Sequence, residues 1–200
     1  MSKKKTLFCI CGETASGKDS LVKSLVDTYP DKFRAVCSYT NRPPRESETE
    51  GVEHYFVSKE EFETLKNTQE DKIIAYTKIE SSDGIGGYEY MALEDELNKS
   101  NIYIIDPKGI KYLKEKCDHK YNIVVFYIFV PLIQRRERAL ESRSDFETEF
   151  EKRVNAENEQ FEEFYNNKEF DYMVYNLDGM FESAHAYMND VMISYINGTI

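Results

Sequence analysis

Apolar residues recur along the chain with two spacings, one typical of buried strands and one typical of amphipathic helices. Short apolar runs predict β-strands, at residues 6–10, 33–37, 72–79, 101–105 and 122–130. Apolar residues three and four positions apart predict helices, at residues 18–29, 59–65, 92–97, 109–115, 132–143, 146–165 and 180–195. Because strands alternate with helices, the pattern predicts an α/β fold with a mainly parallel central sheet and helices on its faces.

Residues 38–91 depart from this alternation, because they are richer in turn-forming and aromatic residues. This composition indicates a small antiparallel insertion. No internal repeat, proline-rich linker or low-complexity segment divides the 200 residues. We therefore expect a single domain over residues 1–200, large enough to bury a substantial core.

The chain is acidic, with a net charge of −11 from 26 Lys and Arg against 37 Asp and Glu. This balance argues against nucleic acid as a partner, because binding it needs a surplus of cations. No apolar stretch approaches the roughly 20 residues that span a bilayer, so we expect no membrane contact and a cytoplasmic location. The cysteines have neither zinc-finger nor redox spacing, which indicates reduced core residues: Cys9, Cys11, Cys37 and Cys117.

A glycine-rich segment follows the first predicted strand and opens the first predicted helix. It reads GETASGKDS over residues 12–20. Glycine, four residues, glycine and lysine form the pattern of a phosphate-binding loop, in which backbone N–H groups, the helix dipole and Lys18 attract phosphate. The pattern normally continues with Ser or Thr on Mg²⁺, whereas this chain has Asp19. A carboxylate is also a suitable Mg²⁺ ligand, so we expect a working nucleotide site with Asp19 and Ser20 near the metal.

Two arginines separated by two prolines mark a second candidate phosphate site. They lie in SYTNRPPR, residues 38–45, and the segment GVEHYFVSKEEF follows at residues 51–62. The prolines stiffen the backbone, and each guanidinium can bind a phosphate through two hydrogen bonds. Alone, this stretch would be interpreted as a solvated turn. With the phosphate-binding loop, it predicts an acceptor site facing a donor site.

Further motifs follow in a fixed order, namely GGYEYMA, IIDPKG, RRERALESR, EKRVNAE and DYMVYNLD. Together with the two phosphate motifs, they make the chain resemble the guanylate kinase family, which transfers the terminal phosphoryl group of ATP to GMP. The resemblance covers almost the whole chain. It implies a P-loop three-layer fold with a core at residues 5–37, 92–130 and 168–200, an NMP-binding insertion at 38–91 and a helical lid at 131–167.

The resemblance also implies the residues of each site, with Mg²⁺ accompanying ATP and dGMP as a second acceptor. The ATP site would comprise Gly12, Glu13, Thr14, Ala15, Ser16, Gly17, Lys18, Asp19, Ser20 and Asn176. The GMP site would comprise Ser38, Arg42, Arg45, His54, Tyr55, Glu80, Tyr90 and Asp106. The catalytic cations would be Lys18, Arg42, Arg138, Arg143 and Arg153, with Arg135 as an alternative to Arg138.

The sequence departs from the family pattern at two positions of the acceptor site. A tyrosine of the family is replaced by His54, so either His54 or its neighbour Tyr55 would contact phosphate. A glutamate that reads guanine in the family falls near residues 75–77, where this chain has none, and Glu80 would supply it from a shifted register.

These departures keep two alternatives open. One is a kinase of another nucleoside monophosphate, and the other is a non-catalytic module that binds phosphorylated peptides. The donor-site residues Gly12, Gly17 and Lys18 favour catalysis. For Asn176, a role as a plain turn residue is as good an interpretation as a contact with adenine. The sequence does not decide between a monomer and a homodimer.

Overall fold

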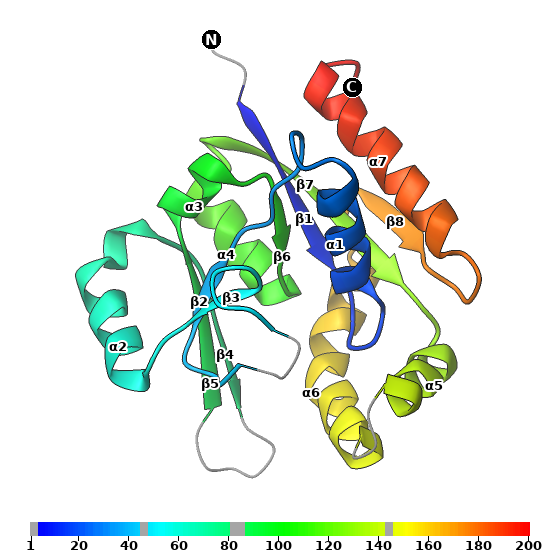
Figure 1. The fold of residues 1–200 in the computed structure, drawn as a ribbon, viewed down its shortest axis with the longest axis horizontal. Helices are drawn as coiled ribbons and strands as arrows, with labels where there is room; N and C mark the ends of the chain where they lie inside the picture. Colours follow the sequence, from blue (N-terminus) through cyan, green and yellow to red (C-terminus); the bar gives the residue numbers. More distant parts are fainter. Residues whose placement is uncertain (1–3, 45–47, 81–86, 143–145) are drawn as a thin grey trace.

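A computed structural model of the chain shows two sheets surrounded by helices (Figure 1). The structure describes residues 4–44, 48–80, 87–142 and 146–200, without the side chains of residues 80, 142 and 146–149. Within the described residues, no helix has the length and apolarity that crossing a membrane requires.

The central sheet is parallel throughout, in the strand order β6-β1-β7-β8. Its strands are β1 (Lys5–Cys11), β6 (Ile102–Ile104), β7 (Tyr121–Phe129) and β8 (Tyr172–Tyr175). The apolar run of β1 is buried on both faces, since Phe8 and Ile10 lie in one core cluster and Leu7 and Cys9 in the other. Such burial explains why the run is apolar without alternation.

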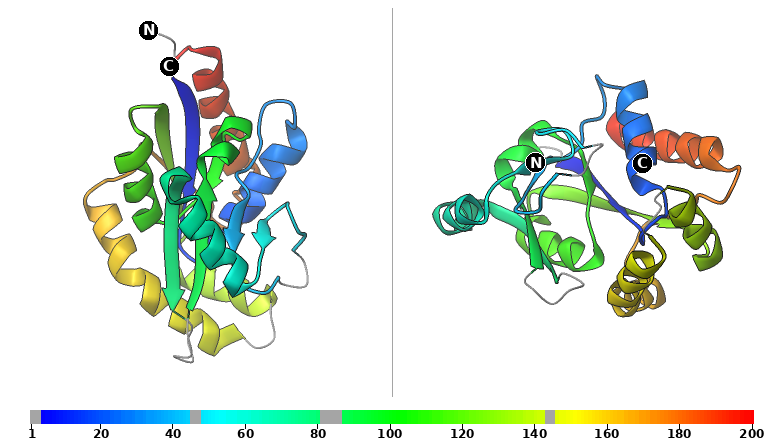
Figure 2. Two further views of the ribbon diagram at one scale, coloured as in Figure 1. Left: turned by 90° about the vertical axis from the view of Figure 1, so that its left-hand side faces the viewer. Right: turned by 60° about the horizontal axis from the view of Figure 1, so that its bottom comes forward.

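Helices cover both faces of this sheet, as predicted. Apolar residues of α1 (Lys18–Thr28) and α7 (Phe181–Asn197) pack against one face. Those of α4 (Pro107–Cys117) and α6 (Phe146–Asn166) pack against the other. Figure 2 shows the two layers of helices on opposite sides of β1. The predicted three-layer α/β fold is confirmed.

A second, smaller sheet has the order β3-β2-β5-β4 and mixes parallel with antiparallel pairs. Its strands are β2 (Ser38–Thr40), β3 (His54–Phe56), β4 (Ile73–Glu80) and β5 (Gly87–Leu93). Helix α2 (Lys59–Thr68) covers it through Phe62, which is buried with Met91. A 3₁₀ turn (Glu70–Lys72) follows α2, and α3 (Glu94–Lys99) leads from β5 back to the central sheet.

Two element predictions were wrong, and one strand of the central sheet was missed. The predicted strand at 33–37 is irregular: Ala35 makes a single bridge with Ile102, after which the chain turns into the second sheet. Its apolar residues are therefore buried by packing rather than by strand pairing. The predicted helix at 92–97 begins at Glu94, because Ala92 still belongs to β5. Strand β8 was not predicted, although its four residues form a short apolar run.

Helices α5 (Leu132–Ser142) and α6 lie next to each other beside the loop that follows β1. Arg136 of α5 pairs with Glu151 of α6. A small apolar cluster contains Ala139 from α5, Phe150 from α6 and, packed against them, Ala15 from the loop. These two helices therefore contact the predicted phosphate-binding loop directly.

Candidate functional site

The loop between β1 and α1 has a backbone that only glycine fits at two positions. A Cβ atom on Gly12 would lie 2.7 Å from Ser16 Oγ and 2.9 Å from the carbonyl oxygen of Ile128. Gly17 has a φ of 79°, and a Cβ there would lie 2.7 Å from Asn176 Nδ2. Positive φ and close approach both exclude larger residues. Both glycines of the sequence motif are therefore required by the shape of the loop.

Lys18 and Asp19 begin α1 at the open end of this loop. Lys18 Nζ lies 3.6 Å from Asp19 Oδ2, and their side chains are 22% and 76% exposed. The first N–H groups of a helix have no partner within it, so this end is a suitable place for phosphate. Asp19 and the exposed Ser20 offer oxygen atoms, the donor type that Mg²⁺ prefers.

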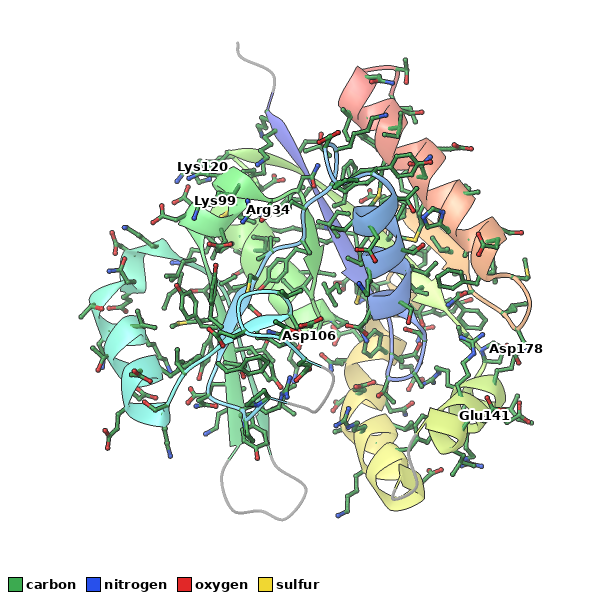
Figure 3. The ribbon with its side chains drawn as sticks, in the orientation of Figure 1. Arg34, Lys99, Asp106, Lys120, Glu141 and Asp178 are labelled. Carbon is green, nitrogen blue, oxygen red and sulfur yellow. The ribbon has the colours of Figure 1, made fainter. Side chains whose placement is uncertain are left out.

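The side chain of Asn176 forms a hydrogen bond with the backbone of the loop. Its Nδ2 donates to the carbonyl oxygen of Ser16 at 2.8 Å, and the residue is buried directly after β8. Arg138 of α5 donates to the carbonyl oxygen of Asn176 at 2.7 Å and to Asp178 Oδ1 at 2.7 and 3.0 Å. These bonds place the partly exposed Arg138 beside the loop, with Asp178 next to α5 in Figure 3. The predicted contact of Asn176 with adenine stays a prediction.

Arg135, on the same helix, is only 5% exposed and lies beneath the loop. It donates to Glu13 Oε1 at 2.9 Å and to the carbonyl oxygen of Thr14 at 3.3 Å. The N–H of Thr14 in turn donates to Glu157 Oε2 of α6 at 2.8 Å. The sequence motifs placed Glu157 at the end of EKRVNAE but predicted no role for it. No local signal marks this bond, because its partners are far apart along the chain.

Arg42 lies in the loop after β2 and is 8% exposed. Its Nη1 and Nη2 each donate to one carboxylate oxygen of Glu48 at 2.8 Å, and its Nε donates to the hydroxyl oxygen of Tyr90 at 3.0 Å. Nη1 also donates to the carbonyl oxygen of Pro43 at 2.8 Å. The planar fork is thus already directed at an anionic group. A phosphate has the geometry to bind the same fork.

His54 of β3 lies beside Arg42. The pairing of β2 with β3 sets Ser38 opposite His54, and Ser38 Oγ shares a hydrogen bond of 2.9 Å with His54 Nδ1. The imidazole also contacts the Tyr90 ring at 5.5 Å. Burial and the charge of Arg42 lower the pKa of His54, against smaller opposing effects from Glu48 and Asp19. The neutral form of this half-buried imidazole is therefore favoured.

Tyr55 points to the opposite face of the same strand. Its ring packs against Tyr39 at a centroid distance of 4.8 Å. Successive side chains of a strand alternate between its faces, so His54 and Tyr55 cannot both face Arg42. The structure brings His54, and not Tyr55, together with Ser38 and Arg42.

Asp106 follows β6 and caps α4. Its Oδ1 accepts from the N–H of Gly109 at 2.6 Å and from the hydroxyl of Thr77 at 3.3 Å. Burial raises the pKa of Asp106, and these two donors oppose the rise. Figure 3 shows Asp106 near the middle of the molecule, between the two sheets. Thr77 lies directly opposite Tyr90 in the second sheet. The second sheet thus brings the Thr77 hydroxyl to Asp106.

The segment expected to hold a base-reading glutamate contains no carboxylate. Ala75 is buried in the core, and the hydroxyl of Tyr76 donates to Glu89 of the neighbouring strand. Lys66 Nζ also donates to Glu89, at 3.0 Å. Although burial alone would raise the pKa of Glu89, these hydrogen bonds lower it. Only Thr77 of this segment contacts Asp106, a role that sequence reasoning missed.

Three further predicted side chains fall in parts of the chain that the structure does not describe. Arg45, Arg143 and the side chain of Glu80 lie outside the described residues. Arg153 is half-buried on α6. Within the described residues, no three His, Cys, Asp or Glu side chains form a metal site. A magnesium ion at Asp19 would thus complete its coordination with phosphate oxygens and water, as this ion commonly does.

Comparison with known proteins agrees with this arrangement. The model of the guanylate kinase family matches residues 4–195. The guanylate kinase of Pasteurella multocida strain Pm70 is 31% identical over 188 residues, which cover 90% of this chain and 83% of that protein. That of Chlamydia felis strain Fe/C-56 is 29% identical over 192 residues, covering 94% and 87%.

A solved structure shares the fold. The guanylate kinase from Anaplasma phagocytophilum superposes with a TM-score of 0.65 at 18% identity, covering 96% of this chain and 86% of that one. This likeness shows a shared fold over most of both chains. The chain belongs to the guanylate kinase family.

Proposed function

We propose that the protein transfers the terminal phosphoryl group of ATP to GMP, forming ADP and GDP, and that it also accepts dGMP. The observation that carries this proposal is the presence of two phosphate-binding arrangements in one fold. The loop with Lys18 would hold the donor, and Arg42 with Tyr90 would hold the acceptor.

On the donor side, the loop and the first turn of α1 would bind the ATP phosphates through backbone N–H groups and Lys18. When bound, Mg²⁺ would neutralise phosphate charge, with Asp19 and Ser20 as the residues that hold it. Arg138, which is oriented by Asp178, would stabilise the transferred group. We assign the same role to Arg143 and Arg153, on the basis of the family resemblance alone.

On the acceptor side, Arg42, Tyr90, His54 and Ser38 would bind the phosphate of GMP. Asp106 is a carboxylate that can accept hydrogen bonds from the ring N–H and the exocyclic amine of guanine. These donors are not presented together by adenine. None of these proposed contacts involves the ribose 2′-hydroxyl, which supports dGMP as a second acceptor.

The chemistry needs positioning more than proton transfer. An oxygen of the acceptor phosphate attacks the γ-phosphorus of ATP, and the bond from that phosphorus to the β–γ bridging oxygen breaks. The attacking oxygen is already anionic, so no general base is required. Catalysis of this kind depends on in-line alignment and on cations around the moving group. Helices α5 and α6, within the proposed lid at residues 131–167, would supply those cations.

The test is ADP release with a panel of acceptors. We expect turnover with GMP and dGMP, a weaker response with IMP, which lacks the exocyclic amine, and little with AMP, CMP or UMP. A GMP reaction no faster than the buffer reaction would overturn the proposal.

One observation favours a second candidate, a kinase of another nucleoside monophosphate. The segment aligned with the glutamate reader contributes only the Thr77 hydroxyl next to Asp106. Faster turnover of another acceptor than of GMP in the same panel would identify that function. Binding of a phosphorylated peptide without turnover would identify the non-catalytic module.

A further inference from the structure

We propose that Arg135 and Glu157 are positioning residues that hold the phosphate-binding loop in its ATP-binding shape from α5 and α6. Both form hydrogen bonds with the same residue of the loop: Arg135 donates to the carbonyl oxygen of Thr14, and Glu157 accepts from the Thr14 N–H. The inference rests on the proposed role of the loop as the donor site. It assigns that site two residues that do not touch the nucleotide.

The guanidinium of Arg135 is committed to protein acceptors. Its Nε donates to the carbonyl oxygen of Val130, immediately after β7, at 3.1 Å, and its Nη2 pairs with Glu13 at 2.9 Å. The other oxygen of Glu13 accepts from the hydroxyl of Tyr127 at 2.8 Å. The buried cation is thus paired with an anion that is itself fixed. This satisfied network links the loop to β7 of the central sheet.

Glu157 restrains the same residue from the neighbouring helix α6. Its carboxylate accepts from the Thr14 N–H at 2.8 Å and is half-buried. Burial raises the pKa of Glu157, whereas the Thr14 N–H and the charges of Lys18 and Arg135 oppose the rise.

The next residue of the loop explains why such restraint is needed. Ala15 has a φ of 61°, a left-handed conformation that a residue with a Cβ adopts only when its surroundings enforce it. Ala15 packs against the cluster of Ala139 and Phe150, which belong to α5 and α6. The hydrogen bonds at Thr14 and the packing at Ala15 come from the same two helices. Together they stabilise the turn that aims the loop.

The experiment compares two variants with matched controls. Arg135→Met removes the guanidinium, and Arg136→Met removes its exposed neighbour on α5. Glu157→Ala removes the carboxylate, and Glu159→Ala removes an exposed one on α6. Loss of one charge-assisted hydrogen bond should weaken binding about tenfold. We expect this increase in the ADP Kd, measured by calorimetry with Mg²⁺, and in the KM for ATP, with the KM for GMP unchanged.

Two additional variants distinguish a loss of loop positioning from a general loss of folded structure. Arg135→Lys should recover part of the ATP affinity, because lysine can pair with Glu13 but lacks the fork. If Arg135→Met does not fold, Glu13→Gln tests the same network with a side chain of equal size. The proposal is overturned if folded Arg135→Met (or Glu13→Gln) and Glu157→Ala proteins bind ADP like the parent, or if the KM values for GMP and ATP rise equally.

Failure of this inference is distinguishable from failure of the proposed function. A parent that phosphorylates GMP, with variants that bind ADP normally, contradicts the positioning role alone. A parent that binds ADP but does not phosphorylate GMP contradicts the function alone, while the ADP Kd values still test the positioning role. A parent that does not bind ADP contradicts both.

Discussion

Lys18 and Asp19 place opposite charges side by side at the start of α1. Lys18 attracts the donor phosphates, whereas the exposed carboxylate of Asp19 repels them unless a cation lies between. The usual serine or threonine at this position has no such charge. Asp19 is therefore expected to make ATP binding depend more strongly on magnesium.

We predict that Asp19→Ser lowers this dependence. The ratio of the ATP Kd without Mg²⁺ to the Kd with saturating Mg²⁺ should be smaller than in the parent, because metal-free ATP is no longer repelled. Asp27→Ser is a matched control, since Asp27 is exposed on the same helix and pairs with Lys23. An unchanged ratio in Asp19→Ser would refute a link between Asp19 and the metal.

Single residues differed in how far the sequence could predict their roles. Gly12, Gly17 and Lys18 were predictable because a local motif encodes the geometry of a tight turn before a helix. Glu157 was not, because the bond between it and Thr14 joins residues 143 positions apart. Its neighbours in the sequence are those of an ordinary charged helix face. Such a partner becomes visible only when the fold brings the two segments together.

The register of β2 against β3 determines which side chains gather at the acceptor site. Ser38 lies opposite His54, so their side chains share a face. Burial of His54 follows from this pairing and lowers its pKa below the ordinary value of about 6.5. In the unfolded chain the imidazole regains that ordinary value. As the pH falls below about 6.5, the unfolded state binds a proton that the folded state does not.

We therefore predict that His54 makes the protein less stable on the acid side of neutrality. The free energy of unfolding should fall more steeply in the parent than in His54→Asn between about pH 7.5 and 5.5, measured by urea denaturation. Asparagine keeps a polar atom near Ser38 but does not titrate. Parallel pH profiles for the two proteins would show that His54 is not buried as a neutral group.

Elements with a long apolar run or a helical spacing of apolar residues were predicted well. The long apolar run in β7 and the helical spacing in α1 each encode their structure locally. The run at 33–37 has the composition of a strand, yet it meets the central sheet at one bridge only. Pairing with an edge strand is a property of the whole sheet. The sequence of a short segment alone cannot distinguish strand pairing from burial by packing.

The candidate donor and acceptor sites both contain cations, although the chain as a whole is acidic. The cations there are paired with carboxylates: Lys18 with Asp19, Arg42 with Glu48 and Arg138 with Asp178. A net charge of −11 is thus compatible with binding two polyanions, because local cations and not the overall balance meet the phosphates. Nucleotide phosphates would compete with these carboxylates for the same donors.

The family and its order of motifs were predictable from the sequence, but the internal pairing of the acceptor arginine was not. Proline-spaced arginines suggest phosphate binding, whereas nothing in the local pattern predicts that Glu48 occupies the fork of Arg42. The absence of a glutamate at 75–77 was visible in the sequence. That Thr77 contacts Asp106 there depends on the strand register of the second sheet.

In the proposed mechanism, a donor and an acceptor phosphate site face each other. The most direct test is the binding of a single compound in which a guanosine and an adenosine are joined by five phosphates. We expect this compound to compete with both ATP and GMP. Its binding should weaken by ~1.5 to 3 kcal/mol in Arg42→Ala, the loss of a charge-assisted contact, and also weaken in Lys18→Met. Arg34→Ala, which changes an exposed arginine (Figure 3), should bind it like the parent. Competition with ATP alone, or full affinity in Arg42→Ala, would mean that the two sites do not face each other.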